Sequence, residues 1–198
     1  MKIILLFLFA LNLIAQDDYS LRVAYGKAAS ADLGNIMIGN FSQYEKDLSV
    51  LALDGGYLLQ KSAFKLPLDV YAKASISQFD ESAVNKSDVY EAALYLKLFW
   101  NFDFLDNRVR FGFGEGLSYA SDILYYEEAE ASDGKTSYLL NYLDISLDFD
   151  FGKLVNYKPL HGTYIGWVLK HRSGIFGLIN GVRKGGSNYN CVYLEKTF

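Results

Sequence analysis

The sequence contains few cysteines, prolines and histidines, the residues that form disulfides, interrupt secondary structure and bind metals. Its single cysteine, Cys191, excludes a disulfide framework within the chain, and only two prolines interrupt 198 residues. The two histidines, His161 and His171, would lie about 33 Å apart on an extended strand, so they cannot share a metal. No metal-binding or cofactor-binding motif is visible, and neither a metal nor a cofactor is expected. A net charge of −4 gives no reason to expect nucleic acid.

Long hydrophobic runs are also missing, apart from one at the start. Lys2 precedes an apolar stretch that reaches Ala15, and Gln16 begins a polar segment. This stretch is too short for a comfortable transmembrane helix but has the form of a secretory signal peptide. We therefore expect residues 1–15 to be a cleaved signal peptide and residues 16–198 to form one exported domain.

The exported part is a series of segments in which apolar and polar residues alternate. Side chains alternate across a strand with a period of two, so this pattern predicts β-structure. The apolar faces are long and rich in Leu and Phe. In one segment, residues 92, 94, 96 and 98 form the apolar face, and residues 91, 95 and 97 lie on the opposite face. The predicted strands cover residues 19–26, 48–59, 66–77, 89–104, 108–120, 138–151, 163–173 and 187–198. Residues 27–46 show only a brief alternation and give no clear prediction.

Connections between the predicted strands alternate in length. Those at 60–65, 105–107 and 152–159 are short or moderate, whereas most of the others are longer and more polar. Short periplasmic turns and longer outer loops are typical of outer-membrane barrels. We predict an all-β fold, an eight-stranded antiparallel transmembrane β-barrel with both termini periplasmic, in the bacterial outer membrane. The final Phe198 resembles the terminal aromatic of such barrels. A soluble periplasmic β-sandwich is the alternative.

The inward faces of the predicted barrel carry charges that can pair. Aligning Tyr119 near Tyr138 places Arg110 beside Asp148 and Arg108 beside Asp150. An eight-stranded barrel has an interior just wide enough for side chains. We therefore expect a lumen filled by salt bridges and not a conducting pore.

Four polar residues fall on faces that should contact lipid: Glu115, Asn141, His171 and Ser173. The expected registers place Glu115 near Asn141 or Tyr142, and Asn141 beside Lys170 or His171. Polar groups facing lipid are costly, and these four fall in one row in the outer-leaflet halves of adjacent strands. Asn188 and Asn190 lie on the same face of the next strand. This row predicts a site that lipid reaches laterally.

The segment His171-Arg172-Ser173, the glycine-containing loop after it and the closing strand to Phe198 resemble the lipid A 3-O-deacylase family, and the broader acyloxyacyl hydrolase-like set. The resemblance implies an esterase that needs no cofactor and acts on lipid A or lipopolysaccharide in the outer leaflet. Ser173 would be its nucleophile and His171 its general base. Gly174 stands where the family commonly has asparagine. The family's glutamate has no counterpart between Gly174 and Leu194.

Other residues near this segment could complete the chemistry. Asn141 or Glu115 could orient the histidine. The glycines Gly174 and Gly177 could let backbone N–H groups approach a developing oxyanion.

Arg183 and Lys184 would suit lipid A phosphates, although basic residues in a rim loop are often only solvated. A non-enzymatic small barrel with a structural, adhesion or lipopolysaccharide-binding role is the second hypothesis. The sequence leaves open whether the chain forms a homodimer.

Overall fold

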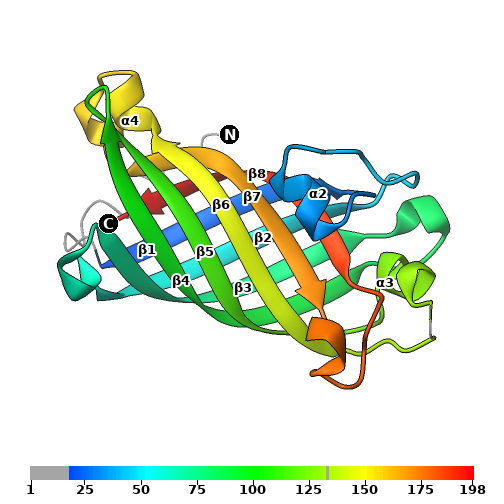
Figure 1. The fold of residues 1–198 in the computed structure, drawn as a ribbon. Helices are drawn as coiled ribbons and strands as arrows, with labels where there is room; N and C mark the ends of the chain where they lie inside the picture. The colour runs from blue at the N-terminus through cyan, green and yellow to red at the C-terminus, as the bar shows by residue number, and fades with distance from the viewer. Residues whose placement is uncertain (1–17, 133) are drawn as a thin grey trace.

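The computed structural model describes residues 18–132 and 134–198. Eight antiparallel strands follow one another around a barrel, which closes because β1 pairs with both β2 and β8 (Figure 1). The predicted barrel is confirmed, and the alternative of a soluble sandwich is wrong. The signal peptide predicted over residues 1–15 lies outside the described residues and stays a prediction. The strands are β1 (Tyr19–Ala28), β2 (Ser49–Gln60), β3 (Leu68–Asp80), β4 (Val89–Phe104), β5 (Asn107–Ala120), β6 (Leu139–Asp150), β7 (Thr163–Ser173) and β8 (Ser187–Thr197).

Short helices lie at both ends of the barrel. The end opposite the chain's C-terminus carries α2 (Leu33–Met37) and α3 (Tyr125–Glu130), and the other end carries α4 (Phe151–Leu154) (Figure 1). Single 3-10 turns occupy other connections: η2 (Ala63–Lys65), η3 (Ser82–Val84), η4 (Lys158–Leu160) and η5 (Ile175–Gly177). Within the described residues, the helices are all too short or too polar to cross a membrane.

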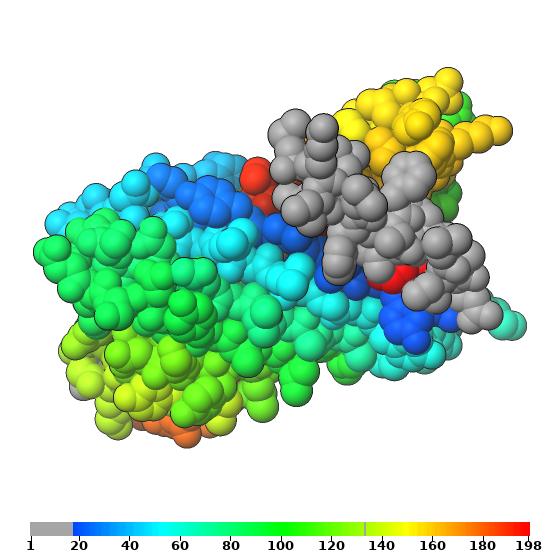
Figure 2. All heavy atoms as spheres, turned by 180° about the vertical axis from the view of Figure 1, so that it is seen from behind, coloured from blue at the N-terminus to red at the C-terminus, as the bar shows by residue number. Residues whose placement is uncertain are grey.

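The outer surface of the barrel is apolar. Figure 2 shows the N-terminal strands as a continuous surface. Outward-facing apolar side chains are widely exposed; Leu94 of β4 is 71% exposed and Ile76 of β3 is 63% exposed. Aromatic rings stand near both ends: Tyr19 contacts Tyr57 at one end, and Tyr119 lies against Tyr138 at the other. An apolar band between aromatic girdles is what a lipid bilayer requires of a barrel. The architecture is that of an outer-membrane barrel, which agrees with the outer-membrane location expected from the sequence.

The first and last strands meet as the sequence pattern predicts. The N–H of Tyr19 donates to the carbonyl of Phe198, and the N–H of Phe198 donates to that of Tyr19, both at 3.0 Å. The described ends of the chain therefore lie together at the end that carries α4. The longer connections at 29–48, 121–138 and 174–186 lie at the opposite end, which we take as the outer end.

One of the two predicted luminal pairs is confirmed. Arg110 and Asp148 are cross-strand partners, and Arg110 donates to Asp148 at 2.7 and 2.9 Å. The pair of Arg108 with Asp150 is wrong, because Arg108 instead binds Asp103 at 2.6 Å across the β4–β5 hairpin. Asp150 is used locally, since its side chain accepts from the N–H of Lys153 and caps α4.

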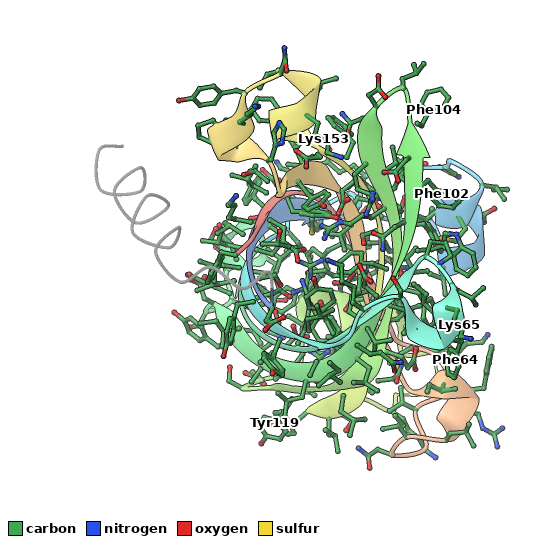
Figure 3. The ribbon with its side chains drawn as sticks, turned by 90° about the vertical axis from the view of Figure 1, so that its left-hand side faces the viewer. Phe64, Lys65, Phe102, Phe104, Tyr119 and Lys153 are labelled. Carbon is green, nitrogen blue, oxygen red and sulfur yellow. The ribbon has the colours of Figure 1, made fainter. Side chains whose placement is uncertain are left out.

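Charged side chains fill the interior, as expected. Asp144 accepts hydrogen bonds from both Arg22 and Lys97, and Arg22 also binds Asp54 at 2.8 Å. All four of these residues are completely buried. Looking along the barrel from the α4 end, Figure 3 shows side chains crowding the lumen, whereas Tyr119 projects away from the wall. Buried charges are tolerated only when paired and hydrogen-bonded, so this network forms a plug.

Candidate functional site

The outward polar residues predicted from the sequence lie in one pocket. Its volume is about 650 Å³, and it sits on the outside of the barrel at the outer ends of β5 to β8. The predicted site residues that line it are Glu115, Asn141, His171, Ser173, Gly174, Arg183 and Lys184. The structure therefore brings together all of the predicted site residues except Gly177.

The alignment of β6 with β7 differs from the prediction. Asn141 lies opposite Ser173, not beside Lys170 or His171, and Leu143 lies opposite His171. Leu143 is also the β6 partner of Glu115, which places Glu115 diagonally from Asn141. The predicted register had been derived by aligning Phe151 with Leu160 across the β6–β7 connection. Instead α4 and η4 occupy the connection, so the β7 ladder begins at Asp150 opposite Tyr164.

Ser173 and His171 share the outward face of β7. They are two residues apart on one strand, which separates their backbones by roughly 6.6 Å. Their side chains are therefore neighbours on one face. Among the described residues, no hydrogen bond joins the Ser173 hydroxyl to the imidazole, whose side-chain partner lies on β8.

That partner is Asn188, which is directly opposite His171 in the β7–β8 ladder. Nδ1 of His171 lies 2.7 Å from Oδ1 of Asn188, and Nδ2 of Asn188 donates to the carbonyl of Ala31 at 3.1 Å. A carbonyl oxygen can only accept, so the amide must turn its NH₂ group toward Ala31 and its oxygen toward the ring. His171 must then donate to Asn188 through Nδ1–H, so a neutral ring carries its lone pair at Nε2; the ring also hydrogen-bonds to the backbone of Ser187.

Neither Asn141 nor Glu115 binds the imidazole in this structure. Sequence reasoning had placed Asn188 on the correct face of the neighbouring strand but had given it no role. The missing information was the β7–β8 register, which sets Asn188 directly across from His171. The short polar side chain at the start of the last strand was the available signal.

The loop after β7 forms the rim of the pocket. Arg183 and Lys184 are both exposed and line it, as predicted for groups that meet phosphate. Gly174 also lines the pocket. The N–H of Gly177, in contrast, donates to the carbonyl of Gly174 at 3.1 Å, so Gly177 is used within the turn and cannot supply an oxyanion donor. Phe176 adds an apolar rim and is 92% exposed.

Helix α3 closes the outer mouth of the barrel beside the pocket. Its Tyr126 lines the pocket, whereas its Glu127 turns inward and is completely buried. The Ser187 hydroxyl donates to Glu127 at 2.8 Å, and Arg172 lies 3.4 Å away. Burial raises the pKa of Glu127 to about 7, with Arg172 opposing that rise. Sequence reasoning did not find this buried carboxyl, because nothing local to the segment indicates which face of α3 is covered.

The described residues contain no cluster of three or more histidine, cysteine or acidic side chains that could hold a metal ion. What the pocket does hold is the Ser173 hydroxyl, the His171 imidazole with Nδ1 bound to Asn188, and two exposed cations at its rim. This set can perform nucleophilic chemistry on a neutral carbonyl and can contact an anionic group.

Comparisons with known proteins give similarity in fold alone. No family profile matches the chain, and no curated protein matches it significantly. Among solved structures, the chain is similar to the outer membrane enzyme PagL, with a TM-score of 0.63 and 12% identity over 90% of this chain and 99% of that one. Neisserial surface protein A (NspA) matches with a TM-score of 0.49 and 12% identity over 92% of this chain and 98% of that one.

Proposed function

We propose that this protein is an outer-membrane esterase that removes a 3-linked hydroxyacyl chain from lipid A. The observation that carries the proposal is the grouping of Ser173, His171 and Asn188 in one pocket on the lipid-facing side of the barrel, near its outer end. The sequence resemblance to lipid A 3-O-deacylases supports the substrate class. The likeness in fold to the outer membrane enzyme PagL agrees with it.

The chemistry follows from the tautomer of His171. Its Nε2 accepts the proton of the Ser173 hydroxyl as the oxygen attacks the ester carbonyl. The protonated ring then donates to the leaving alkoxide, and an acyl-serine remains. Water, activated by the same ring nitrogen, hydrolyses that ester and frees Ser173. Gly174 lines the pocket, and we assign its N–H as a backbone donor to the oxyanion.

Asn188 takes the position of the acidic residue that the resemblance leads one to expect on the last strand. Its oxygen fixes the ring orientation of His171, as a third member must, but carries no negative charge. The imidazolium that forms during attack is therefore stabilised less than it would be by a carboxylate. We therefore expect a slow enzyme. Asn141, which lies opposite Ser173, and the exposed Glu115 line the wall of the pocket.

The pocket surroundings suit lipid A in the outer leaflet. Arg183 and Lys184 face the end where headgroup phosphates lie, and charge-assisted hydrogen bonds to phosphate are strong. Phe113 and Phe176 line the same pocket and can meet hydrocarbon. A substrate with an anionic head and several acyl chains can thus enter from the side without leaving the membrane.

A non-enzymatic barrel that contacts lipopolysaccharide is the second candidate. It is favoured by two observations: no hydrogen bond joins Ser173 to His171 among the described residues, and an amide stands in place of a carboxylate. The same cationic rim would then serve binding alone.

Mass spectrometry of lipid A separates the two functions. Cells that produce the wild-type protein should yield lipid A lighter by one hydroxyacyl chain, and Ser173→Ala should abolish this change, with purified activity at least about a thousandfold lower. Ser82→Ala, an exposed serine in η3, is the matched control and should behave as wild type. Unmodified lipid A in wild-type cells, or equal activity of Ser173→Ala, would leave only the binding role.

A further inference from the structure

A segment of the β1–β2 loop covers part of the barrel's outer wall. Residues 29–41, here called the strap, lie against β7 and β8. Leu169 faces outward on β7, yet it is completely buried in a cluster with Ile36 and the alanines Ala29 and Ala31. The rings of Phe41 and Trp167 meet edge to face at 5.5 Å. The strap therefore replaces lipid as the neighbour of these strands, directly beside the pocket.

The strap holds Asn188 at both its backbone and its side chain. The N–H of Ala29 donates to the carbonyl of Asn188 at 2.9 Å, and the side-chain Nδ2 donates to the carbonyl of Ala31 at 3.1 Å. Tyr126 of α3 contacts both the strap and Asn188. Its hydroxyl donates to the carbonyl of Ala29 and also hydrogen-bonds with the Asn188 side chain. Asn188 is buried beneath these contacts.

An asparagine beside a histidine has a weakness that a carboxylate lacks. Either end of the amide can face the ring, and the two orientations favour opposite tautomers. With its oxygen toward Nδ1, Asn188 leaves Nε2 able to accept a proton. With its NH₂ group toward Nδ1, it would favour the Nε2–H tautomer, which cannot act as a base toward Ser173.

We propose that Tyr126 and the strap are positioning elements, which lock the Asn188 amide in one orientation and so select the Nδ1–H tautomer of His171. The catalytic consequence of this selection rests on the proposed function, whereas the tautomer itself does not. Tyr126 contributes a hydrogen-bond donor to Ala29 and an acceptor for the amide, and the Ala31 carbonyl contributes a second acceptor. With both acceptors on this side, the NH₂ group of Asn188 faces Tyr126 and Ala31, and its oxygen faces His171.

The scarcity of histidine makes the tautomer directly measurable. His161 is exposed in the turn before β7, so His161→Asn leaves His171 as the single histidine. In protein labelled with ¹⁵N-histidine and reconstituted in detergent micelles, ring nitrogen shifts at high pH report which nitrogen carries the proton. We expect the Nδ1–H form in this background. A predominant Nε2–H form would overturn the proposal.

Two variants test the positioning, and one serves as control. Tyr126→Phe removes only the hydroxyl, and Ile36→Ala loosens the strap without touching a hydrogen bond; each should raise the Nε2–H fraction. Tyr125→Phe, on the neighbouring residue of α3, should leave the spectrum unchanged. If Tyr126→Phe and Ile36→Ala both fold, as judged by heat-modifiable mobility, and both keep the pure Nδ1–H spectrum, the strap does not select the tautomer.

Activity then separates this inference from the proposed function. In an active enzyme, Tyr126→Phe should lower kcat about tenfold, the worth of one neutral hydrogen bond, with little change in KM. A kcat that stays at the wild-type value while the tautomer mixes would overturn the positioning role. If the spectra change as expected but wild-type protein hydrolyses no lipid A, the proposed function fails and the tautomer selection stands.

Discussion

Replacing Glu127 with glutamine should remove most of the pH dependence with which α3 docks on the barrel. Glu127 is the residue by which α3 enters the outer mouth of the lumen, and it is completely buried there. The groups that face it come from four other elements. They are Arg172 on β7, Ser187 on β8, Glu91 on β4 and Glu81 in the connection after β3.

The pKa of Glu127 is raised from its ordinary 4.5 to about 7, chiefly by burial; Arg172 and the Ser187 hydrogen bond oppose this rise, and the carboxylates Glu91 and Glu81 add to it. The docked state therefore binds the proton more tightly than the undocked state. Docking is strongest below about pH 4.5 and weakens as the pH rises to about 7, where the loss levels off. The difference corresponds to ~3 kcal/mol, or more than a hundredfold in the docking equilibrium.

Hydrogen exchange of the α3 amides in detergent-solubilised protein, corrected for the intrinsic exchange rate, measures this equilibrium between pH 4.5 and 8. Wild-type α3 should open more than about a hundredfold more readily at the upper end, and Glu127→Gln should show a nearly flat profile. Glu128→Gln, an exposed neighbour paired with Lys86, should keep the wild-type profile. An unchanged slope in Glu127→Gln would refute this account of the docking.

Two further predictions concern the stability of the barrel, measured by urea unfolding in micelles. Asp144→Asn should lower the free energy of unfolding by about 3–5 kcal/mol, because two buried cations lose their shared carboxylate, whereas Ser146→Ala on the same face should cost far less. Gly166→Ala should cost about 1–3 kcal/mol, since a Cβ there would meet a backbone carbonyl at 2.3 Å; Gly55→Ala, with nothing within 4 Å, should not. Equal losses within either pair would contradict the packing argument.

The strands were predictable because a two-residue period leaves little freedom in a barrel of this size. A shift of one residue would turn Leu94 into the lumen and Lys97 into lipid, so the alternation alone fixes which face is which. Complementary charges also predicted the alignment of β5 with β6, in which Arg110 lies opposite Asp148. Patterns of this kind depend only on neighbours along one strand or across one hairpin.

The parts that sequence reasoning missed depend on connections. The actual β6–β7 register differs from the predicted one because residues between Phe151 and Gly162 form α4 and η4. These elements take up more residues than a simple turn would. The strap was missed although Asp32 caps α2 by accepting from the N–H of Asn35, a recognisable start signal. Where a loop folds back onto the barrel is set by long-range packing, which a local period does not encode.

The distribution of polar groups explains why the site lies outside the barrel. Inside, cations such as Arg22 and Lys97 already meet carboxylates, so the luminal charges are committed to the plug. Outside, polar groups survive only near the rim, where the strap shields one flank of the pocket from hydrocarbon. The β5 flank remains open and carries the exposed Phe113 and Glu115. Because the strap occupies the side of β8, we expect a lipid to approach Ser173 from the open β5 flank.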